Sequence, residues 1–368
     1  MNVLVTGSNG FIGKNLIVHL NELENYDVLT FSRENSIDEL KELIIHAGAI
    51  IHLAGENRPK DASAFKIVNT ELTQLLCDEV RSSGRHIPIV FASSIQADFE
   101  NPYGRSKLAA EMIIKKLAIE IGNPTFIYRL PGVFGKWCRP NYNSVVATFC
   151  HNIANGLPIQ INEPSKELNL VYIDDVVTEF INAISLQSEN HTTFSVSPEY
   201  TISLGELAVQ INNFKSSRKS LVSEQVGNGL TRSLYSTYTS YLPPDQFSYT
   251  VPLYSDHRGL FVEMLKTKDS GQFSFFTAHP GVTRGGHYHH SKTEKFMVIR
   301  GTARFGFRHV VNNESYEVVT NGNEPIIVDT VPGWTHDITN IGDDDLIVLL
   351  WANEIFNRDN PDTIMSEV

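Results

Sequence analysis

Two patterns of apolar and polar residues divide the chain. The first starts with the apolar run Met1–Thr6, passes through a glycine turn, and then shows apolar residues at helical spacing from Phe11 to Leu20. Further apolar runs, separated by helical patterns, follow at Val28–Phe31, Ala49–Leu53, Ile87–Phe91 and Thr125–Tyr128. Strands that alternate with helices form a parallel sheet covered on both faces. We therefore expect an α/β, Rossmann-type doubly wound domain.

The pattern changes from Leu242 onward. Helical spacing fades, and turn residues separate short apolar runs at short intervals, as in an all-β sandwich or barrel. The expected strands are Phe273–Thr277, Lys295–Val298, Ala303–Val310, Glu324–Val328 and Leu346–Trp351. We place the boundary near Pro244, which gives an α/β domain of residues 1–244 and a β domain of residues 245–368.

Length, composition and charge narrow the picture. A chain of 368 residues exceeds what one hydrophobic core usually organises, and its 41% of apolar residues is too high for a disordered protein. The formal net charge of −12 disfavours nucleic acid as a partner, because binding a polyanion needs a basic face. The sequence contains neither an apolar run long enough to span a bilayer nor a secretory signal, so we expect a cytoplasmic protein without membrane association.

A glycine turn joins the first expected strand to the first expected helix. Gly7, Gly10 and Gly13 approximate the GxGxxG fingerprint of dinucleotide-binding proteins, although Asn9 occupies the place of the second glycine. Glycine allows a positive φ and lets the backbone approach a pyrophosphate at the helix N-terminus. The turn therefore predicts a dinucleotide site.

The end of the second expected strand bears on which dinucleotide binds. An NAD enzyme usually has an acidic residue there for the ribose hydroxyls, whereas this chain has Phe31-Ser-Arg33. A guanidinium suits a 2′-phosphate, so we expect NADPH as the cofactor. The alternative is that Arg33 only faces solvent.

A tyrosine and a lysine lie one helical turn apart. Tyr103 and Lys107 follow a strand that ends in Ser93 and Ser94. A nearby ammonium favours the ionised phenol, which can exchange a proton with a carbonyl or an alcohol, and a serine hydroxyl can hold the same oxygen. Taken alone, such a pair is more typical of an ordinary helix surface.

A cluster of metal-ligand residues lies in the second half of the chain. His287 and His289 alternate on an expected strand and so share a face, and Glu294 follows after a short spacer. His336 can reach that face from a distant strand of a closed barrel. Three imidazoles and a carboxylate suit Zn²⁺ or another borderline divalent ion.

Together, the N-terminal features resemble the short-chain dehydrogenase/reductase superfamily, in its extended type that acts on nucleotide sugars. Similar segments are His52-Leu-Ala-Gly55, Tyr128-Arg-Leu-Pro-Gly-Val-Phe-Gly135 and Leu170-Val-Tyr-Ile-Asp-Asp175. The resemblance implies a catalytic set of Ser94, Tyr103 and Lys107, with Ser93 structural unless the two serines exchange roles. The expected cofactor-binding residues are Gly7, Gly10, Phe11, Ile12, Gly13, Arg33, Leu53, Ala54, Gly55, Tyr103 and Lys107.

The same resemblance narrows the reaction. Extended members that dehydrate sugars have Asp-Glu just after the catalytic hydroxyl residue, whereas this chain has Ile95 and Gln96. The acid and the base of a 4,6-dehydration are therefore lacking. Reduction and 4-epimerisation both remain.

The C-terminal features resemble the cupin fold. The spacing of the glycine and ligand residues from Gly281 to Gly301 is similar to the first cupin motif, and Pro332–Asn340 is nearly the second. The second domain is therefore expected to be an all-β cupin barrel with His287, His289, Glu294 and His336 as metal ligands.

A second resemblance overlaps the cupin motifs. Asp256–Glu263 and Val282–Tyr288 are similar to segments of the deoxysugar-nucleotide 3,5-epimerases. This resemblance implies that Arg258, Glu263 and Arg284 bind the nucleotide sugar and that His287 removes a proton. One imidazole nitrogen cannot bind a metal and act as a base at once. Either a metal polarises the ketone while Lys295, His290 or Asp337 moves the proton, or His287 is itself the base.

From end to end, the chain resembles the CapF-type bifunctional enzymes of bacterial capsule and O-antigen synthesis. The most specific segments are Phe134–Ser144, which contains the substrate-binding candidates Asn141 and Asn143, and His287–His290. The resemblance implies that the cupin epimerises C3 of UDP-2-acetamido-2,6-dideoxy-hexos-4-ulose. The first domain would then reduce the C4 ketone with NADPH to UDP-2-acetamido-2,6-dideoxy-L-talose, a precursor of N-acetyl-L-fucosamine.

The resemblance also implies a homodimer or a higher homo-oligomer. One alternative remains open. The protein would then be a single-activity 4-reductase or 4-epimerase of a nucleotide sugar, with a cupin that is structural or only binds sugar.

Overall fold

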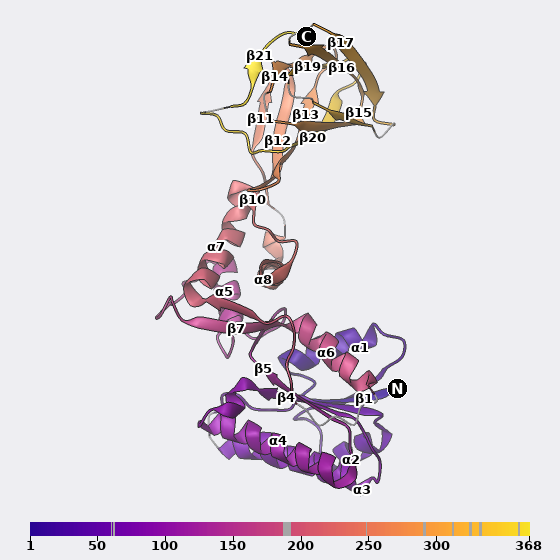
Figure 1. Cartoon of the computed structure of the whole chain (residues 1–368), viewed down its shortest axis with the longest axis vertical. Coiled ribbons are helices and arrows are strands. Elements are labelled where there is room, and N and C mark those ends of the chain that lie inside the picture. Colours follow the sequence, from indigo (N-terminus) through magenta and orange to yellow (C-terminus); the bar gives the residue numbers. More distant parts are fainter. Residues whose placement is uncertain are drawn as a thin grey trace. The chain divides into compact units, whose positions relative to one another are not determined.

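The computed structural model describes the chain except residues 60, 62, 187–192, 248, 290–291, 311–312, 324–325, 331–332 and 360. Two compact units are present, Met1–Ile211 with Arg232–Pro243 and Asn212–Thr231 with Pro244–Val368 (Figure 1). The boundary near Pro244 stays a prediction. Among the described residues, the helices lack the combination of length and apolar composition that crossing a membrane requires.

The first unit is built on a six-stranded sheet of order β2-β1-β3-β4-β5-β8, in which every pair of neighbours is parallel. Its strands are β1 (Asn2–Thr6), β2 (Asp27–Phe31), β3 (Ala49–His52), β4 (Ile89–Ser94), β5 (Thr125–Leu130) and β8 (Thr193–Phe194). The central strands read as continuous apolar runs because both faces of the sheet are covered. The sheet is the doubly wound type that the sequence predicts.

Helices cover both faces of this sheet (Figure 1). Alternate residues of a strand point to opposite faces, so Val3 and Val5 pack under α1 and α6, while Leu4 packs under α2, α3 and α4. The covering helices are α1 (Phe11–Asn21), α2 (Ile37–His46), α3 (Leu72–Ser82), α4 (Pro102–Ile121) and α6 (Ile173–Ser185). A π-helical stretch, Phe65–Glu71, runs directly into α3.

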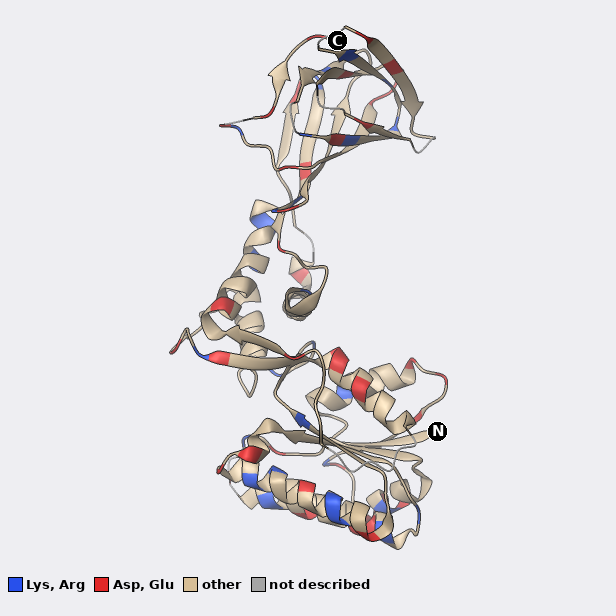
Figure 2. Cartoon of the chain, viewed as in Figure 1, with Lys and Arg blue, Asp and Glu red and all other residues tan. Residues whose placement is uncertain are grey.

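Helix α4 shows how local sequence sets the position of the predicted catalytic pair. Asn101 caps its N-terminus by accepting the Gly104 N–H at 2.8 Å, and Pro102 occupies the first turn. Gly122 ends the helix with a left-handed φ of 67°. Basic and acidic residues are mixed along its outer surface, as expected for a solvated helix face (Figure 2).

Smaller elements complete the first unit, and two helices run across the division between the units. The smaller elements are the 3-10 turn Ile95–Asp98, β6 (Gly132–Phe134), α5 (Val145–Ala154), β7 (Glu167–Tyr172) and β9 (Tyr200–Ser203). Strands β6, β7 and β9 form a separate three-stranded sheet. The two helices across the division are α7 (Leu204–Ser220) and α8 (Gly229–Thr239).

The second unit contains two mostly antiparallel sheets. One has the order β10-β12-β13-β20-β15-β18, with β11 beside β12, and the other has the order β17-β16-β19-β14-β21. The strands of the first are β10 (Val222–Ser223), β11 (Leu253–Asp256), β12 (Gly259–Thr267), β13 (Gly271–Ala278), β15 (Glu294–Arg300), β18 (Ile327–Asp329) and β20 (Leu346–Ala352). Those of the second are β14 (Thr283–Tyr288), β16 (Thr302–His309), β17 (Ser315–Asn321), β19 (Trp334–Asn340) and β21 (Ile364–Met365).

Apolar residues of both sheets form one core in the second unit. Phe276, Phe296 and Val348 come from the first sheet, and Phe305 and Ile338 come from the second. The predicted β architecture is therefore present. Of the strand expected at Glu324–Val328, residues 324–325 lie outside the described part of the chain. The observed strand, β18, covers Ile327–Asp329.

Candidate functional site

The glycine turn of the first unit lies at the switch point of the parallel sheet. The chain passes from β1 to β2 on one side and returns to β3 on the other side of β1, and ligands bind such sheets at the carboxyl ends of these strands. Thr6 joins the two ends, because its Oγ1 accepts the Leu53 and Ala54 N–H groups at 3.2 Å each. The predicted cofactor residues after β1 and after β3 thus come together.

Gly7 allows this close approach. Its φ is +70°, and a Cβ there would lie 2.7 Å from the Ala54 backbone nitrogen. Gly10 then precedes α1 as an N-cap without a side-chain hydrogen bond, and the first turn carries no acidic residue. The N–H groups of this turn and the helix dipole can therefore receive a phosphate. Phe11 and Ile12 begin the helix and pack against the core beneath it.

Arg33 lies two residues beyond β2, and its side chain is 81% exposed. Its guanidinium pairs with the Glu56 carboxylate. The other oxygen of Glu56 accepts a hydrogen bond from the Tyr142 hydroxyl at 3.2 Å. Asn141 and Asn143, the substrate-binding candidates on either side of Tyr142, are exposed. The segment that holds them therefore contacts the loop that follows Gly55.

Asn69, which no sequence pattern predicted, holds that loop in place through its side chain. Its Oδ1 accepts the Glu56 N–H at 2.7 Å, and its Nδ2 donates to the Glu56 carbonyl at 3.1 Å and to Ser106 Oγ at 2.9 Å. Asn69 lies in the π-helical stretch, where i, i+4 periodicity does not predict side-chain direction. Its position could only be found from the fold.

The predicted catalytic residues Ser94, Tyr103 and Lys107 come together at the carboxyl end of β4. A Cβ on Gly104 would lie 2.1 Å from the Gln96 carbonyl oxygen, so the start of α4 packs directly on the turn after Ser94. Burial raises the pKa of Tyr103, and a hydrogen bond with Ser94 offsets part of this rise. The phenol is therefore protonated at neutral pH and can donate its proton.

Lys107 is 5% exposed. Its Nζ donates to the Ala92 carbonyl at 2.7 Å and lies 4.6 Å from the centre of the Phe91 ring. Burial lowers the pKa of Lys107 to about 8, and the nearby Glu111 carboxylate opposes this effect. The ammonium form at neutral pH is thus held by one carbonyl, one ring and one carboxylate.

Ser93 has a different environment from Ser94. Its hydroxyl donates to the Glu111 carboxylate at 2.5 Å, and Arg129 binds both oxygens of that carboxylate at 2.9 and 2.8 Å. Burial of Glu111 is outweighed by these hydrogen bonds, so its pKa is lowered. Ser93 therefore belongs to a buried network, whereas Ser94 lies beside the phenol.

The four predicted metal ligands come together in the second unit. His287 on β14 and His336 on β19 are direct partners across the sheet, and Glu294 begins β15 of the facing sheet. One potential ligand atom from each of His287, His289, Glu294 and His336 lies within 4.8 Å of all the others. The last three side chains are buried.

The chemistry of this cluster fits a divalent cation. Glu294 Oε2 lies 3.2 Å from His289 Nε2 and 3.4 Å from His336 Nε2. Burial would raise the pKa of Glu294, but hydrogen bonds from His289, His336 and Lys292 keep it well below its usual range. Burial and the two neighbouring histidines lower the pKa of His287 to about 4. A neutral imidazole and an ionised carboxylate are the forms that bind a metal.

Lys295 does not reach this cluster. It follows Glu294 on β15 and points to the opposite face, where its Nζ lies 2.6 Å from Asp329 Oδ1 and the side chain is 51% exposed. The lysine at the cluster is Lys292, whose buried Nζ lies 2.9 Å from Glu294 Oε1. Lys292 lies two residues before β15, outside any helix or strand, so no periodicity predicted the direction of its side chain.

Of the remaining site candidates in the second unit, Arg258 and Arg284 lie close enough to interact, whereas Glu263 and Asp337 each pair with another side chain. Arg258 pairs with Asp256 at 2.6 Å, and both interact electrostatically with Arg284 on β14. Glu263 pairs with Lys266 at 2.8 Å on its own strand. Asp337 faces Arg304 at 3.1 Å. His290 and Pro332, which the sequence analysis also invoked, lie outside the described residues.

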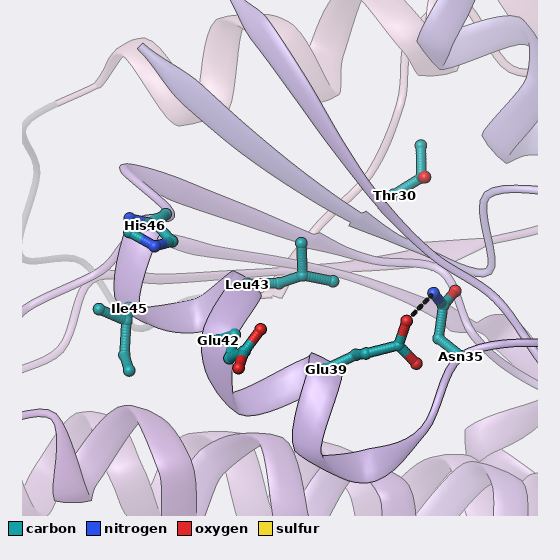
Figure 3. Close-up of a pocket in the computed structure, with 7 residues that line it drawn as sticks. All are labelled: Thr30, Asn35, Glu39, Glu42, Leu43, Ile45 and His46. Atoms are coloured by element: carbon teal, nitrogen blue, oxygen red, sulfur yellow. Dashed lines mark hydrogen bonds between the residues drawn. The ribbon is translucent and has the colours of Figure 1, made fainter.

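A shallow hollow beside α2 has no part in these clusters. It is lined by Thr30, Asn35, Glu39, Glu42, Leu43, Ile45 and His46 (Figure 3). Glu39 accepts the Ser36 N–H in a capping box and also contacts Asn35 at 3.4 Å. Its carboxylate thus stabilises the start of α2, and none of the predicted site residues lines the hollow.

Two known families match this chain, one in each of its two units. Residues 3–196 match the NAD dependent epimerase/dehydratase family, and residues 254–364 match the polysaccharide biosynthesis C-terminal domain. The UDP-2-acetamido-2,6-beta-L-arabino-hexul-4-ose reductase of Pseudomonas aeruginosa is 60% identical over 368 residues, covering 100% of this chain and 99% of that protein.

Solved structures give the same picture. The capsular polysaccharide assembling protein CapF from Staphylococcus aureus is 40% identical, with a TM-score of 0.93 over 100% of both chains. UDP-glucuronic acid 4-epimerase from Bacillus cereus, in complex with NAD, is 18% identical with a TM-score of 0.56. It covers 66% of this chain and 98% of its own, and this similarity concerns the fold alone.

Two glycines with similar positive φ angles provide a test of the dinucleotide turn. Gly84 has a φ of +67° and open space around its Cβ position, whereas Gly7 combines a φ of +70° with the Ala54 backbone. We expect Gly7→Ala and Gly84→Ala to share a conformational cost of about 1–2 kcal/mol. Only Gly7→Ala should also weaken binding of a nicotinamide dinucleotide, by about tenfold or more, because the loop after β3 must move.

Fluorescence titration with NADPH and thermal unfolding of both variants measure these effects. Equal NADPH affinity in the two variants would show that the turn is not the cofactor site.

Proposed function

This chain belongs to the NAD dependent epimerase/dehydratase family, and from that premise we propose that it carries out two consecutive reactions on one UDP-activated 4-keto-6-deoxy-HexNAc. The predicted resemblance and fold class are confirmed by relatives that match the chain from end to end. The protein is a nucleotide-sugar reductase. The finer proposal is a C3-epimerase in the cupin followed by a C4-ketoreductase in the first unit, supplying a capsule or O-antigen precursor.

One observation carries the bifunctional proposal. Ser94, Tyr103 and Lys107 form one reactive group in the first unit, and a second buried group of titratable residues occupies the second unit of the same chain. Hydride transfer to a ketone needs only the first group. The second group is suited to a separate step, the removal and return of a proton.

For the reduction, bound NADPH supplies the hydride that reaches C4 of the sugar. Tyr103 gives its proton to the C4 oxygen as the alcohol forms, and Ser94 donates a hydrogen bond to the same oxygen. The Lys107 charge stabilises the phenolate that remains until a solvent proton replaces the lost one. Because burial raises its pKa, Tyr103 carries its proton at neutral pH and has it available for this step.

The proposed cofactor preference depends on Arg33. Its exposed guanidinium at the end of β2 is available to a 2′-phosphate, provided that it leaves the Glu56 carboxylate. We infer NADPH on this basis.

For the epimerisation, a proton next to the 4-ketone is acidic because the resulting enolate spreads its charge onto the ketone oxygen. Zn²⁺ or another divalent ion held by His287, His289, Glu294 and His336 would polarise that oxygen. Lys292 adds a positive charge beside Glu294, whereas Lys295, the lysine expected to move the proton, pairs with Asp329 instead. His287 remains either a ligand or the base, because its neutral form suits both.

A second candidate function is a reductase with a structural cupin. The name of the Pseudomonas aeruginosa relative mentions reduction alone, which favours this reading. The homodimer or higher homo-oligomer implied by the resemblance also remains a proposal, and light scattering in solution would measure it.

The two proposed activities should be separable. In D₂O without NADPH, the protein is expected to exchange the C3 proton of the UDP 4-keto-6-deoxy-HexNAc, followed by NMR. Tyr103→Phe should keep this exchange and lose NADPH oxidation by about 100-fold or more, because it lacks the proton donor. Lys292→Met should reduce exchange by about 100-fold. Lys295→Met is the matched control and should exchange at the wild-type rate.

Bound metal is measured in each variant, so that a loss of charge is distinguished from a loss of metal. If the wild-type protein reduces the sugar without exchanging the C3 proton, the cupin is not an epimerase and the second candidate function holds.

The cofactor proposal is tested at Arg33. Arg33→Ser should raise the KM for NADPH about tenfold or more and leave the KM for NADH unchanged, since only NADPH loses a charged hydrogen bond. Glu56→Gln keeps the guanidinium and should keep the preference. Equal KM values for both cofactors in the wild-type protein would rule the proposal out.

The buried ammonium of Lys107 predicts how the rate of the reduction depends on pH. Lys107 is charged below its pKa of about 8 and neutral above it. Steady-state kcat/KM for the reduction should therefore be level from about pH 6 to 7.5 and fall above pH 8, as the phenolate loses its stabilising charge. Lys107→Arg, although slower, should lack this fall because arginine stays charged. An unchanged alkaline limb in that variant would contradict the assignment.

A further inference from the structure

The C-terminal segment lies against the strand that carries the first metal-ligand candidate. Strand β21 pairs antiparallel with β14, with Met365 opposite His287 and Ile364 opposite Tyr288. Ser366 continues the pairing, because its N–H donates to the Gly286 carbonyl at 2.9 Å. Residues far from the cupin motifs in sequence thus border the cluster.

Asp362, just before β21, fixes the orientation of His289. Its backbone carbonyl oxygen lies 2.5 Å from His289 Nδ1. A carbonyl can only accept, so the proton of this bond is on Nδ1. The lone pair of the neutral ring is then on Nε2, the nitrogen that lies 3.2 Å from Glu294 Oε2. The ring is 2% exposed, so it has little freedom to turn.

The Asp362 side chain binds the backbone of Lys292, the lysine beside Glu294. Its Oδ2 accepts the Lys292 backbone N–H at 2.8 Å. Lys292 in turn places its Nζ 2.9 Å from Glu294 Oε1, which leaves Oε2 directed at the histidines. One aspartate therefore orients His289 directly and Glu294 through Lys292.

We propose that Asp362 is a positioning residue of the cupin metal centre, holding His289 in the Nδ1–H tautomer and Glu294 with one oxygen toward the ion. The proposal rests on the proposed metal centre. Groups that orient metal ligands in this way typically change metal affinity about 10–100-fold when they are removed. None of the sequence motifs includes Asp362.

The test compares Asp362→Ala with Asp362→Asn in the full chain. Asparagine keeps an oxygen that can accept the Lys292 N–H, whereas alanine does not. Zn²⁺ affinity, measured by competition with a chromogenic chelator, should fall about 10–100-fold in Asp362→Ala and stay at the wild-type value in Asp362→Asn. Asp345→Ala, which removes another carboxylate bound to a histidine, His279 at 2.8 Å, should have no effect.

The outcomes separate this inference from the proposed function. If the wild-type protein binds no Zn²⁺ and contains no other divalent metal, the metal centre itself is refuted. If it binds Zn²⁺ and Asp362→Ala binds equally well, the Asp362 side chain does not position Lys292 and Glu294, and that part of the proposal is overturned. An equal loss in Asp362→Asn would mean that negative charge matters rather than the hydrogen bond, and would also overturn the proposal.

A measurement on the wild-type protein does not depend on how the variants fold. In the Zn²⁺-loaded form, ¹⁵N NMR of the imidazole should show His289 protonated at Nδ1 and coordinated through Nε2. The opposite tautomer would refute the assignment.

Discussion

The buried ammonium of Lys107 is the constraint on which the catalytic face of the first unit depends. Removing a charged amine from water costs several kcal/mol unless partners replace the lost hydration. The Ala92 carbonyl and the Phe91 ring supply two of these partners from β4, and Glu111, one turn further along α4, supplies a negative charge. The end of β4 and the start of α4 are therefore fixed to each other.

Glu111 extends this constraint to the serines. A buried carboxylate must have all its acceptor positions filled, and Ser93 and Arg129 fill them. With the Ser93 side chain directed at Glu111, the next residue of the extended strand must point the other way. Ser94 thus points to the Tyr103 phenol, because Ser93 is bound to Glu111. The Glu111 carboxylate in turn stabilises the charged form of Lys107. In the second unit a buried carboxylate is also paired through both oxygens: Glu294 Oε1 interacts with Lys292, and Oε2 lies near the imidazoles of His289 and His336.

Sequence periodicity could predict what depends on neighbours along the chain. Continuous apolar runs separated by helical patterns predicted the parallel sheet, and strand alternation placed His287 and His289 on one face. The same alternation, applied from Glu294 to its neighbour, would place Lys295 on the opposite face, so the expectation that Lys295 moves the proton conflicted with the strand period. Lys292 and Asn69 could not be found in this way, because a turn and a π-helical stretch have no fixed side-chain period. The role of Asp362 could not be predicted either, because it depends on pairing between β14 and β21, which are distant in sequence.

The position of β21 has a practical consequence for recombinant work on this protein. Arg308 donates to Ser366 Oγ at 3.0 Å and to the Glu367 carbonyl, so both residues are held against β16. An affinity tag fused after Val368 would be separated by only three residues from β21, the strand that borders His287. An unexpected metal content in such a preparation should therefore be checked against protein carrying the tag elsewhere.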